Sequence, residues 1–373
     1  MMFYSVKKIA THGSTYVFQV FTEASKFTTP ATYRVILAGF VKLFGISSVG
    51  AVRFYSFVVS FLSVPVFYLV ARKIDPASPG IRTLQYGFLP IVFQFFFLIY
   101  TDIPALLCLL LSLYFVLGNK PSWSAFWGLA ALLIRQNSIP WLFLFFLLIY
   151  LADNGFSFTM EKIKRHLEKN WFFLLIFILF IGFVIANHGV ALGDRDMHPF
   201  PSFHMGNVYF SLFFFFFMFL PLNLSNAKDI WRHLRRDKFE LVVLTAFFFF
   251  YFFTFREYHP YNYCFGFVRN HILYFLSSSP LRRTLFFLPV AYSVLSLRVT
   301  KFTRSYFYFL YPVTALYLMP SWLIEPRYYI VPFVLFELFR EKRSASLEFS
   351  TLICFLIFSG WLFYNLIMLR FFL

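Results

Sequence analysis

Charged side chains are scarce in this sequence, since only 13% of its 373 residues are Asp, Glu, Lys or Arg. A soluble domain needs more polar surface than this to cover its core. The composition is instead 60% hydrophobic, with a mean hydropathy of +0.71, which predicts a membrane protein that crosses the bilayer several times. The three cysteines, Cys108, Cys264 and Cys354, show no pairing pattern, so we expect them to be small buried apolar side chains and expect no disulfide framework.

Acidic residues are scarcer than basic ones, which leaves a formal net charge of +17. In a soluble protein this excess would suggest a nucleic-acid partner. Most of the basic residues fall in short connections between apolar runs, however, as membrane topology signals do. No basic face and no nucleic-acid-binding motif is visible. The sequence therefore predicts a membrane lipid environment and no nucleic-acid partner.

The apolar runs predict an all-α polytopic membrane protein with about 12 transmembrane helices, because a span needs roughly 20 apolar residues and a short or tilted one about 17. The expected spans lie near residues 54–71, 83–99, 102–118, 122–135, 138–151, 171–190, 205–222, 240–256, 284–297, 305–322, 328–339 and 350–369. Residues 34–46 are too short for a span and contain Lys42, which favours an interfacial or re-entrant helix. We therefore expect two parts: a non-cytoplasmic segment over 1–53, with an upstream span missing from this sequence, and a multispanning domain over 54–373.

The basic connections predict the orientation of the chain. If alternate connections share one side, that side collects 19 of the 33 Lys and Arg residues, and the positive-inside rule makes it cytoplasmic. These connections are 71–83, 119–121, 152–170, 223–239, 298–304 and 340–345. The opposite side receives 1–33, 100–102, 135–137, 191–204, 256–283 and 325–327. An extra span near 263–280 is the alternative to one long non-cytoplasmic segment at 256–283.

Five polar clusters map to this non-cytoplasmic side: Asp102, residues 135–137, residues 191–204, residues 256–271 and residues 323–333. Ionisable groups at membrane depth cost several kcal/mol, so they are usually paired or functional. Each cluster could also be a solvated helix end, and Arg135 could form a salt bridge with Asp194. Guanidinium groups suit an anionic phosphate, and carboxylates suit proton abstraction from a hydroxyl. Aromatic side chains such as Trp322 could stack on sugars or anchor the chain at the interface. The spacing of the histidines matches no zinc pattern.

The ordered strings within these clusters resemble the endoplasmic-reticulum alpha-1,2-glucosyltransferase family that adds the last glucose to the dolichol-linked oligosaccharide. The matching strings are KFTTPATY (26–33), VRFYSFVVS (52–60), YTD (100–102), RQNSIPW (135–141), GDRDMH (193–198), FHMGNVYFSLFFFF (203–216), HPY (259–261) and EPRYYIVPF (325–333). The resemblance covers most of the chain from residue 26 onward.

This resemblance implies a multispanning glycosyltransferase of the endoplasmic reticulum membrane. The donor is dolichyl phosphate glucose, the acceptor is Glc2Man9GlcNAc2 on dolichyl diphosphate, and the alpha-1,2 bond forms with inversion in the lumen. No cofactor and no metal are expected. The candidate catalytic carboxylates are Asp194, Asp102 and Glu23. The candidate substrate-binding residues are Arg135, Gln136, Asn137, Arg195, His198, His204, His259, Tyr261, Arg269, His271, Glu325, Arg327 and Tyr328.

One departure from the family pattern concerns the catalytic base. The family carries an Asp-Glu-x-x-His motif shortly before its Thr-Thr-Pro-Pro string, whereas this sequence has only Glu23 there and Ala31 at the second proline. We expect one of three explanations: a truncated sequence, substitution of the base by Glu23 or Asp102, or a non-catalytic homologue. A transporter of a lipid-linked anion is the remaining alternative. It would favour internal repeats, and none is visible.

Overall fold

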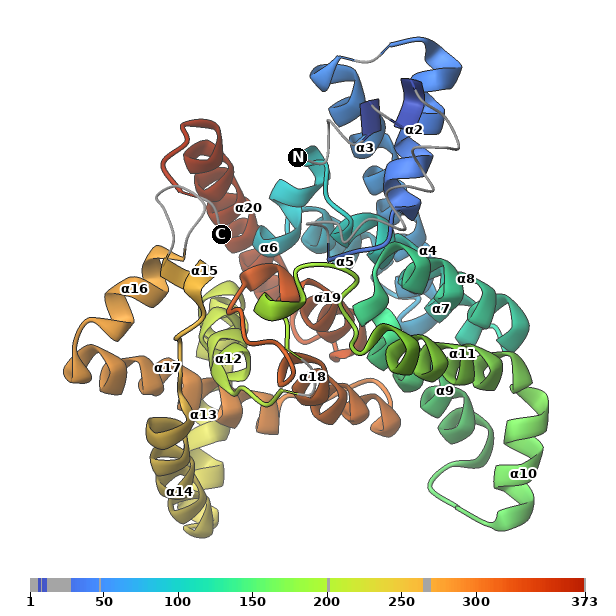
Figure 1. Cartoon of the computed structure of the whole chain (residues 1–373). Coiled ribbons are helices and arrows are strands. Elements are labelled where there is room, and N and C mark those ends of the chain that lie inside the picture. Colours follow the sequence, from blue (N-terminus) through green and yellow to red (C-terminus); the bar gives the residue numbers. More distant parts are fainter. Residues whose placement is uncertain are drawn as a thin grey trace. The chain divides into compact units, whose positions relative to one another are not determined.

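The computed structural model describes residues 6–7, 9–11, 28–46, 48–199, 202–263 and 270–371, and Figure 1 traces their helices. Over these residues the secondary structure is helical, with one isolated bridge between Phe302 and Arg340 and no named strand. The predicted all-α class is confirmed. The chain separates into two compact units: unit 1 is Met1–Pro79 with Phe95–Phe200, and unit 2 is Gly80–Gln94 with Pro201–Leu373. This division follows packing, and the expected membrane-topology boundary between 53 and 54 stays a prediction.

Unit 1 contains two helical hairpins and a bent helix pair. Its elements are α2 (Thr32–Phe44), α3 (Val49–Phe61), α4 (Ser63–Ile74), η1 (Gln94–Phe97), α7 (Asp102–Val116), α8 (Pro121–Ile134), η2 (Gln136–Ser138), α9 (Ile139–Asn154), α10 (Met160–Lys169), α11 (Trp171–Asn187) and η3 (Arg195–Met197). The α7–α8 hairpin is joined inside the apolar layer by the Ser112 hydroxyl, which lies 2.8 Å from the Ser124 carbonyl oxygen. A small polar pair of this kind allows close helix packing at membrane depth.

The elements of unit 2 are α5 (Pro79–Gly87), α6 (Pro90–Phe93), α12 (Gly206–Met218), α13 (Leu220–Arg236), α14 (Phe239–Thr254), α15 (Pro260–Tyr263), α16 (His271–Ser277), α17 (Pro280–Val299), η5 (Ser305–Phe309), α18 (Leu310–Leu318), η6 (Pro326–Tyr329), α19 (Ile330–Phe339) and α20 (Ala345–Ile367). In this unit, helices α12, α13, α14 and α16 pack on α17. Asn226 on α13 donates to the Ser296 and Thr300 hydroxyls of α17 and its end, at 2.8 and 3.0 Å. Buried amides thus connect helices whose remaining surfaces are apolar.

Three stretches are long and apolar enough to cross a membrane: Val49–Ile74, Gln136–Asn154 and Ala345–Ile367. Three bent helix pairs raise the number to as many as six if each pair is one span. The chain is therefore a polytopic membrane protein, and the predicted number of about twelve spans is not confirmed. The bends lie at 98–101, at Asn170 and at Phe219, close to the ends of expected spans.

Several expected spans are interrupted in the structure, although the sequence predicted one continuous helix for each of them. The expected span 83–99 is divided among α5, α6 and η1, since the break falls just before Pro90 and Leu89 is extended with ψ of 118°. Proline lacks an amide donor and disfavours helical geometry in the residue before it. The expected spans 305–322 and 328–339 likewise each begin as a 3-10 turn, η5 and η6, before continuing as α18 and α19.

Two segments contain only short helices in the described residues, and their predicted placement relative to the membrane stays a prediction. Residues 34–46 correspond to α2, a helix of 13 residues, which is too short to span at 1.5 Å per residue. Within 256–283, the described residues form α15 and the seven-residue α16, neither of which could cross a bilayer. Residues 264–269 of the alternative span lie outside the described part of the chain.

The bend between α12 and α13 shows how an apolar helix breaks without losing its hydrogen bonds. Pro221 stands at the start of α13, where its missing amide is harmless. The Asn223 side chain is fully buried and donates to the carbonyl oxygens of Phe215 and Phe216, at 3.2 and 2.9 Å. An unpaired carbonyl inside a bilayer is costly, and the Phe215 oxygen still accepts the Phe219 amide at 3.0 Å, so the Asn223 amide replaces a helical donor at Phe216.

Inside each unit, some connections that the predicted alternation puts on the same side contact one another, and the alternation itself stays a prediction. In unit 1, Lys169 bridges Asn119 and Asp153 at 2.9 and 2.7 Å, which joins two expected cytoplasmic connections. In unit 2, the Glu341 amide donates to the Lys301 carbonyl oxygen at 2.8 Å, and Arg343 lies 3.5 Å from Asp229. The expected non-cytoplasmic connections contact one another separately, as described below for the candidate site.

A buried cluster of charges centres on Arg340 in unit 2. Its guanidinium lies 2.7 Å from a Glu337 oxygen and 2.5 Å from a Glu348 oxygen, and the three side chains are at most 2% exposed. Gln85 donates to Glu348 at 3.0 Å. Arg82 donates to the carbonyl oxygens of Glu337 and Arg340 at 2.6 and 2.8 Å, which satisfies the end of α19. The cluster joins α5, α19 and α20.

Replacing Arg340 with methionine is expected to destabilise unit 2 by about 3–5 kcal/mol, because two carboxylates stay buried without their cation. The measurement is the midpoint of thermal unfolding of the purified protein in detergent. Arg165→Met is the matched control, since the Arg165–Glu161 pair is mostly exposed and contributes only about 0.5 kcal/mol. Equal midpoints for the two variants would contradict this role for Arg340.

Candidate functional site

The polar residues of unit 1 meet where α7 begins and α8 ends. Asp102 is the first residue of α7 and Arg135 follows the last residue of α8. Their side chains form an ion pair and are only 4% and 9% exposed. The Arg135 Nε group also donates to the Asn137 Oδ1 atom at 3.0 Å. Arg135 therefore forms its salt bridge with Asp102, whereas the sequence had suggested Asp194 as the partner. The positive charge of Arg135 is neutralised by this carboxylate.

The segment before α2 closes this cluster. The Gln136 side-chain amide donates to the Thr28 carbonyl oxygen, and the Leu192 amide donates to the same oxygen at 3.4 Å. Thr28 thus joins two of the predicted polar connections. No side-chain motif predicted this role, because the contact uses a backbone carbonyl. The residues over 28–29, 100–102, 135–137 and 191–192 consequently form one polar region, which we call the unit 1 cluster.

Asp194 lies on the loop that continues from this contact. It has a φ of 51°, a left-handed conformation that aspartate adopts more readily than most residues. The Asp194 carbonyl oxygen lies 3.1 Å from the His198 Nδ1 atom, which places His198 back over its own loop. Arg195 begins the 3-10 turn η3, and its side chain is not among those described. Glu23 lies outside the described residues.

Two oxygen atoms of the unit 1 cluster are buried and receive no hydrogen bond within the described part of the chain. They are Asp102 Oδ2 and Gln136 Oε1. A buried acceptor without a donor is costly, so such atoms mark positions where a donor group completes the structure. The available chemistry of this cluster is therefore that of hydrogen-bond acceptors. Acceptors suit hydroxyl groups and do not suit a phosphate.

Unit 2 holds a separate cluster of aromatic rings around Trp322. The ring of His259 contacts Trp322 edge to face with centroids 4.7 Å apart, and the ring of His204 stacks on it at 5.9 Å. His259 is fully buried, and its Nδ1 accepts the Tyr261 amide at 3.0 Å, which leaves that nitrogen unprotonated. Burial lowers the pKa of His204 below its ordinary value. His204 is therefore neutral near pH 7, and its role as a substrate-binding residue stays a prediction.

Two asparagines position the loop that carries the charged residues of unit 2. Asn207 donates to the carbonyl oxygens of Ser321 and Leu323 at 2.9 and 2.8 Å, and its Oδ1 accepts the Tyr329 hydroxyl at 3.1 Å. Asn262 accepts the Ile324 amide at 3.3 Å. Sequence reasoning missed both roles. The available signal was an amide side chain inside an otherwise apolar run, FHMGNVYF.

The loop held in this way presents an ion pair between Glu325 and Arg327, whose atoms lie 2.6 Å apart. Arg327 keeps 24% of its side chain exposed and lies 5.7 Å from the Tyr328 ring centre. His271 lies at the exposed start of α16. Arg269 lies outside the described residues. Unit 2 thus presents a partly exposed guanidinium beside aromatic rings, an arrangement suited to an anionic group next to a sugar.

Glu257 is a buried carboxylate that the sequence reading quoted but did not select. It is 7% exposed and lies 3.5 Å from Arg283, which also donates to the Phe255 carbonyl oxygen. Burial raises the pKa of Glu257, and the nearby Arg283 and Arg256 oppose that shift only in part. Its carboxyl thus keeps a proton to higher pH than an exposed glutamate would.

The part of the chain that the structure describes contains no group of three or more His, Cys, Asp or Glu side chains placed to hold a metal ion.

This chain is a polytopic all-α membrane protein, because it has apolar helices, buried charges that are paired with one another and two polar clusters. The sequence model of the DIE2/ALG10 family matches residues 11–157 and 153–338, so the chain belongs to that family. No solved structure matches it.

Similar curated proteins come from fungi and mammals and share one printed name, Dol-P-Glc:Glc(2)Man(9)GlcNAc(2)-PP-Dol alpha-1,2-glucosyltransferase. The protein from Candida albicans is 28% identical over 288 residues, which cover 70% of this chain and 62% of that protein. The proteins from Homo sapiens and Mus musculus are each 23% identical, over 83% and 79% of this chain and 77% and 72% of their own lengths. The chain thus spans 62–77% of the lengths of these relatives.

The raised pKa of Glu257 predicts the direction of a pH effect on stability. A carboxyl whose pKa is higher in the folded protein than in the unfolded chain stabilises the fold below its ordinary value of 4.5, and this stability is lost as the pH rises through the folded pKa. Glu257→Gln keeps the protonated shape, so the decline in thermal unfolding midpoint with rising pH should become shallower than in the wild type. Glu161→Gln, at an exposed position, is the control. Parallel pH profiles for wild type and Glu257→Gln would rule out the shift.

Proposed function

We propose that this chain transfers glucose from dolichyl phosphate glucose to Glc2Man9GlcNAc2 on dolichyl diphosphate, forming an alpha-1,2 bond on the luminal side of the endoplasmic reticulum membrane. Membership of the DIE2/ALG10 family supports the activity, together with the shared printed name of relatives from distant organisms. The luminal location rests on the predicted topology, which puts both polar clusters on the non-cytoplasmic side.

The structural observation that carries the proposal is the difference in chemistry between the two clusters. The unit 1 cluster offers buried acceptors, Asp102 Oδ2 and Gln136 Oε1, which suit sugar hydroxyls. The unit 2 cluster offers the partly exposed Arg327, which is paired with Glu325 and lies 5.7 Å from the Tyr328 ring centre, and such a group suits a sugar phosphate. A transferase that uses a lipid phosphate sugar as donor and an oligosaccharide as acceptor needs both kinds of recognition.

The reaction proposed for these groups is a single inverting displacement. The 2-hydroxyl of the acceptor glucose attacks C1 of the donor glucose, the bond from C1 to the phosphate oxygen breaks, and dolichyl phosphate leaves with the electron pair. A carboxylate takes the hydroxyl proton, for which Asp194, Asp102 and Glu23 are the candidates. A cation next to the donor phosphate would stabilise the charge that develops on this leaving group.

Asp102 and Asp194 differ in what they can contribute. Asp102 shares one oxygen with Arg135 and is held at a helix start, so it is positioned rigidly but lies deep in the protein. Asp194 lies on an irregular loop and is half-buried. We therefore assign Asp194 to the acceptor hydroxyl that reacts. Asp102 and Gln136 are assigned to other hydroxyls of the acceptor sugar, which they would bind without reacting.

Expression in cells that lack the terminal glucosyltransferase should restore the fully glucosylated lipid-linked oligosaccharide. The measurement is the size of the released oligosaccharide by chromatography, which should shift by one hexose. Asp194→Asn should lower the rate of glucose transfer by about 10²–10⁴-fold if this carboxylate is the base, since general-base catalysis contributes that much. Asp102→Asn should weaken acceptor binding more than the rate at saturation.

Asp237→Asn is the control, because Asp237 lies on a predicted cytoplasmic connection after α13. The protein must be present in the membrane in equal amounts for every variant. Absence of the one-hexose shift with wild-type chain at normal abundance would contradict the proposed activity. Unchanged transfer by Asp194→Asn would remove that residue from the role of base and leave Glu23 and Asp102.

A further inference from the structure

Helix α13 turns away from the apolar helix α12 by 97°. α12 contains no charged residue, whereas four of the 17 residues of α13 are Lys or Arg. A helix with this many cations does not enter hydrocarbon, because each charged group is costly there and long basic side chains reach for the interface. The bend therefore directs α13 along the bilayer surface, at the point where the apolar helix ends.

One side of α13 packs inside unit 2 and the opposite side is exposed. Leu222, Asn226 and Ile230 are buried, and the helix packs on α17 and α20. Leu224 and Trp231 lie seven residues apart, on one side of the helix, and are 62% and 57% exposed. Tryptophan is enriched at the level of the lipid headgroups, because its ring is apolar and its N–H is polar. The outer side of α13 thus has the apolar residues of a helix that lies in the bilayer interface.

The cations of α13 lie on the same outer side. Lys228 and Arg235 each follow an exposed apolar residue by four positions, which puts them in one row with these residues. Arg232 and Arg236 lie beside this row, and all four cations are exposed. The Arg235 guanidinium lies 4.5 Å from the Trp231 ring centre, which holds a positive charge next to the aromatic ring.

Most of this positive charge is not neutralised inside the protein. The single acidic residue of α13, Asp229, lies 2.6 Å from Arg232 and 3.5 Å from Arg343. In the part of the chain that the structure describes, no carboxylate forms an ion pair with the other three cations of α13. Clusters of at least four Lys and Arg residues on an amphipathic helix attract anionic lipids. The charge of α13 is therefore complementary to lipid phosphates.

We infer that the outer side of α13 binds anionic phospholipid headgroups at the bilayer surface, with Lys228, Arg235 and Arg236 at their phosphates and Trp231 among them. The predicted topology puts residues 223–239 on the cytoplasmic side, which is the leaflet that carries anionic lipids. The polar clusters of the proposed transfer reaction lie on the opposite predicted side. The ligand is therefore a bilayer phospholipid, and the inference does not depend on the proposed function.

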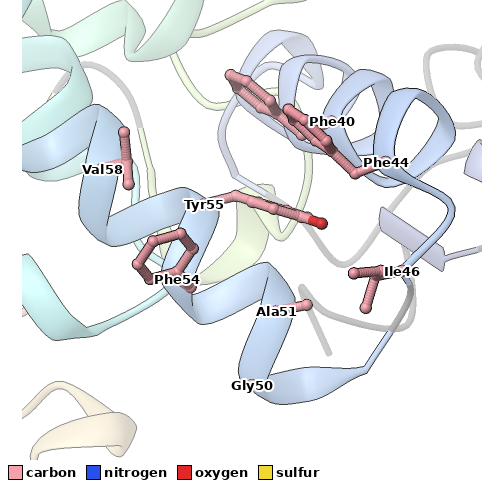
Figure 2. A pocket seen from close by; sticks show the side chains of 8 residues that line it. All are labelled: Phe40, Phe44, Ile46, Gly50, Ala51, Phe54, Tyr55 and Val58. Atoms are coloured by element: carbon pink, nitrogen blue, oxygen red, sulfur yellow. The ribbon is translucent and has the colours of Figure 1, made fainter.

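The cavity between α2 and α3 in unit 1 lacks this combination of features. Figure 2 shows Phe40, Phe44, Phe54 and Tyr55 among the residues that line its volume of about 550 Å³. No Lys or Arg belongs to its lining in the described part of the chain, so a headgroup phosphate has no counterpart there.

A triple variant, Lys228→Gln with Arg235→Gln and Arg236→Gln, tests the cations. The full-length protein in detergent is titrated with phosphatidylserine and with phosphatidylcholine, and bound lipid is measured by native mass spectrometry. Each cation near the headgroups contributes about fivefold to the affinity, so phosphatidylserine should bind on the order of a hundredfold more weakly. The affinity for phosphatidylcholine should stay at the wild-type value. These side chains are exposed, so the variant should keep its fold.

The matched control is Lys42→Gln with Lys120→Gln and Arg370→Gln, which removes the same charge from three separate exposed positions. It should bind phosphatidylserine as the wild type does, because charges farther away than about 8 Å are screened at physiological salt. An equal loss in both triple variants would assign the lipid preference to net charge alone and overturn the inference. A wild-type protein that binds both lipids equally would overturn it as well.

Trp231→Phe tests the position of α13 without removing a charge. The protein is reconstituted in vesicles of phosphatidylserine whose acyl chains are brominated near the headgroup, since bromine quenches tryptophan fluorescence on contact. The difference in fluorescence between wild type and Trp231→Phe reports this one tryptophan among the seven in the chain. We expect brominated lipid to reduce that difference. A difference that stays the same in brominated and ordinary vesicles would place Trp231 away from lipid and refute the inference, even if the triple variant fails to fold.

Discussion

The paired guanidinium of Arg340 is the interaction on which unit 2 depends. It neutralises two carboxylates from different helices, and Arg82 covers the carbonyl oxygens at the end of one of them. In a low-dielectric interior an unpaired charge is prohibitive, so these groups can be buried only together. The cluster consequently fixes the relative positions of α5, α19 and α20, whose other contacts are apolar and less directional.

The same constraint explains why amide side chains recur at irregular points of the fold. Asn207, Asn223 and Asn262 each donate to carbonyl oxygens that a break or a loop leaves without a helical partner. Irregular backbone at membrane depth is tolerated where protein groups satisfy it. The candidate site in unit 2 depends on the same kind of hydrogen bonding. The loop from 321 to 329 can leave helical geometry because Asn207 binds it at several points.

The sequence predicted the fold class well, because the class depends on composition and on hydrophobic run length. It failed at 83–99, where Pro90 interrupts a run that hydropathy alone reads as continuous. The polar clusters were found, since charges stand out in an apolar chain. The ion pair between Asp102 and Arg135 was not predicted, because these residues are 33 positions apart in the sequence and each could have paired with another residue. The roles of Thr28 and Asn262 depend on backbone atoms, which no residue pattern encodes.

The contacts of Arg82 also determine the order in which the protein can be assembled. Arg82 is separated by 255 residues from Glu337, whose carbonyl oxygen it binds. All of Phe95–Phe200 lies between them and packs into unit 1. Contacts this distant in sequence form late, and domains generally complete themselves in the order of synthesis. During translation Arg82 can therefore reach these carbonyl oxygens only after most of the chain has been synthesised.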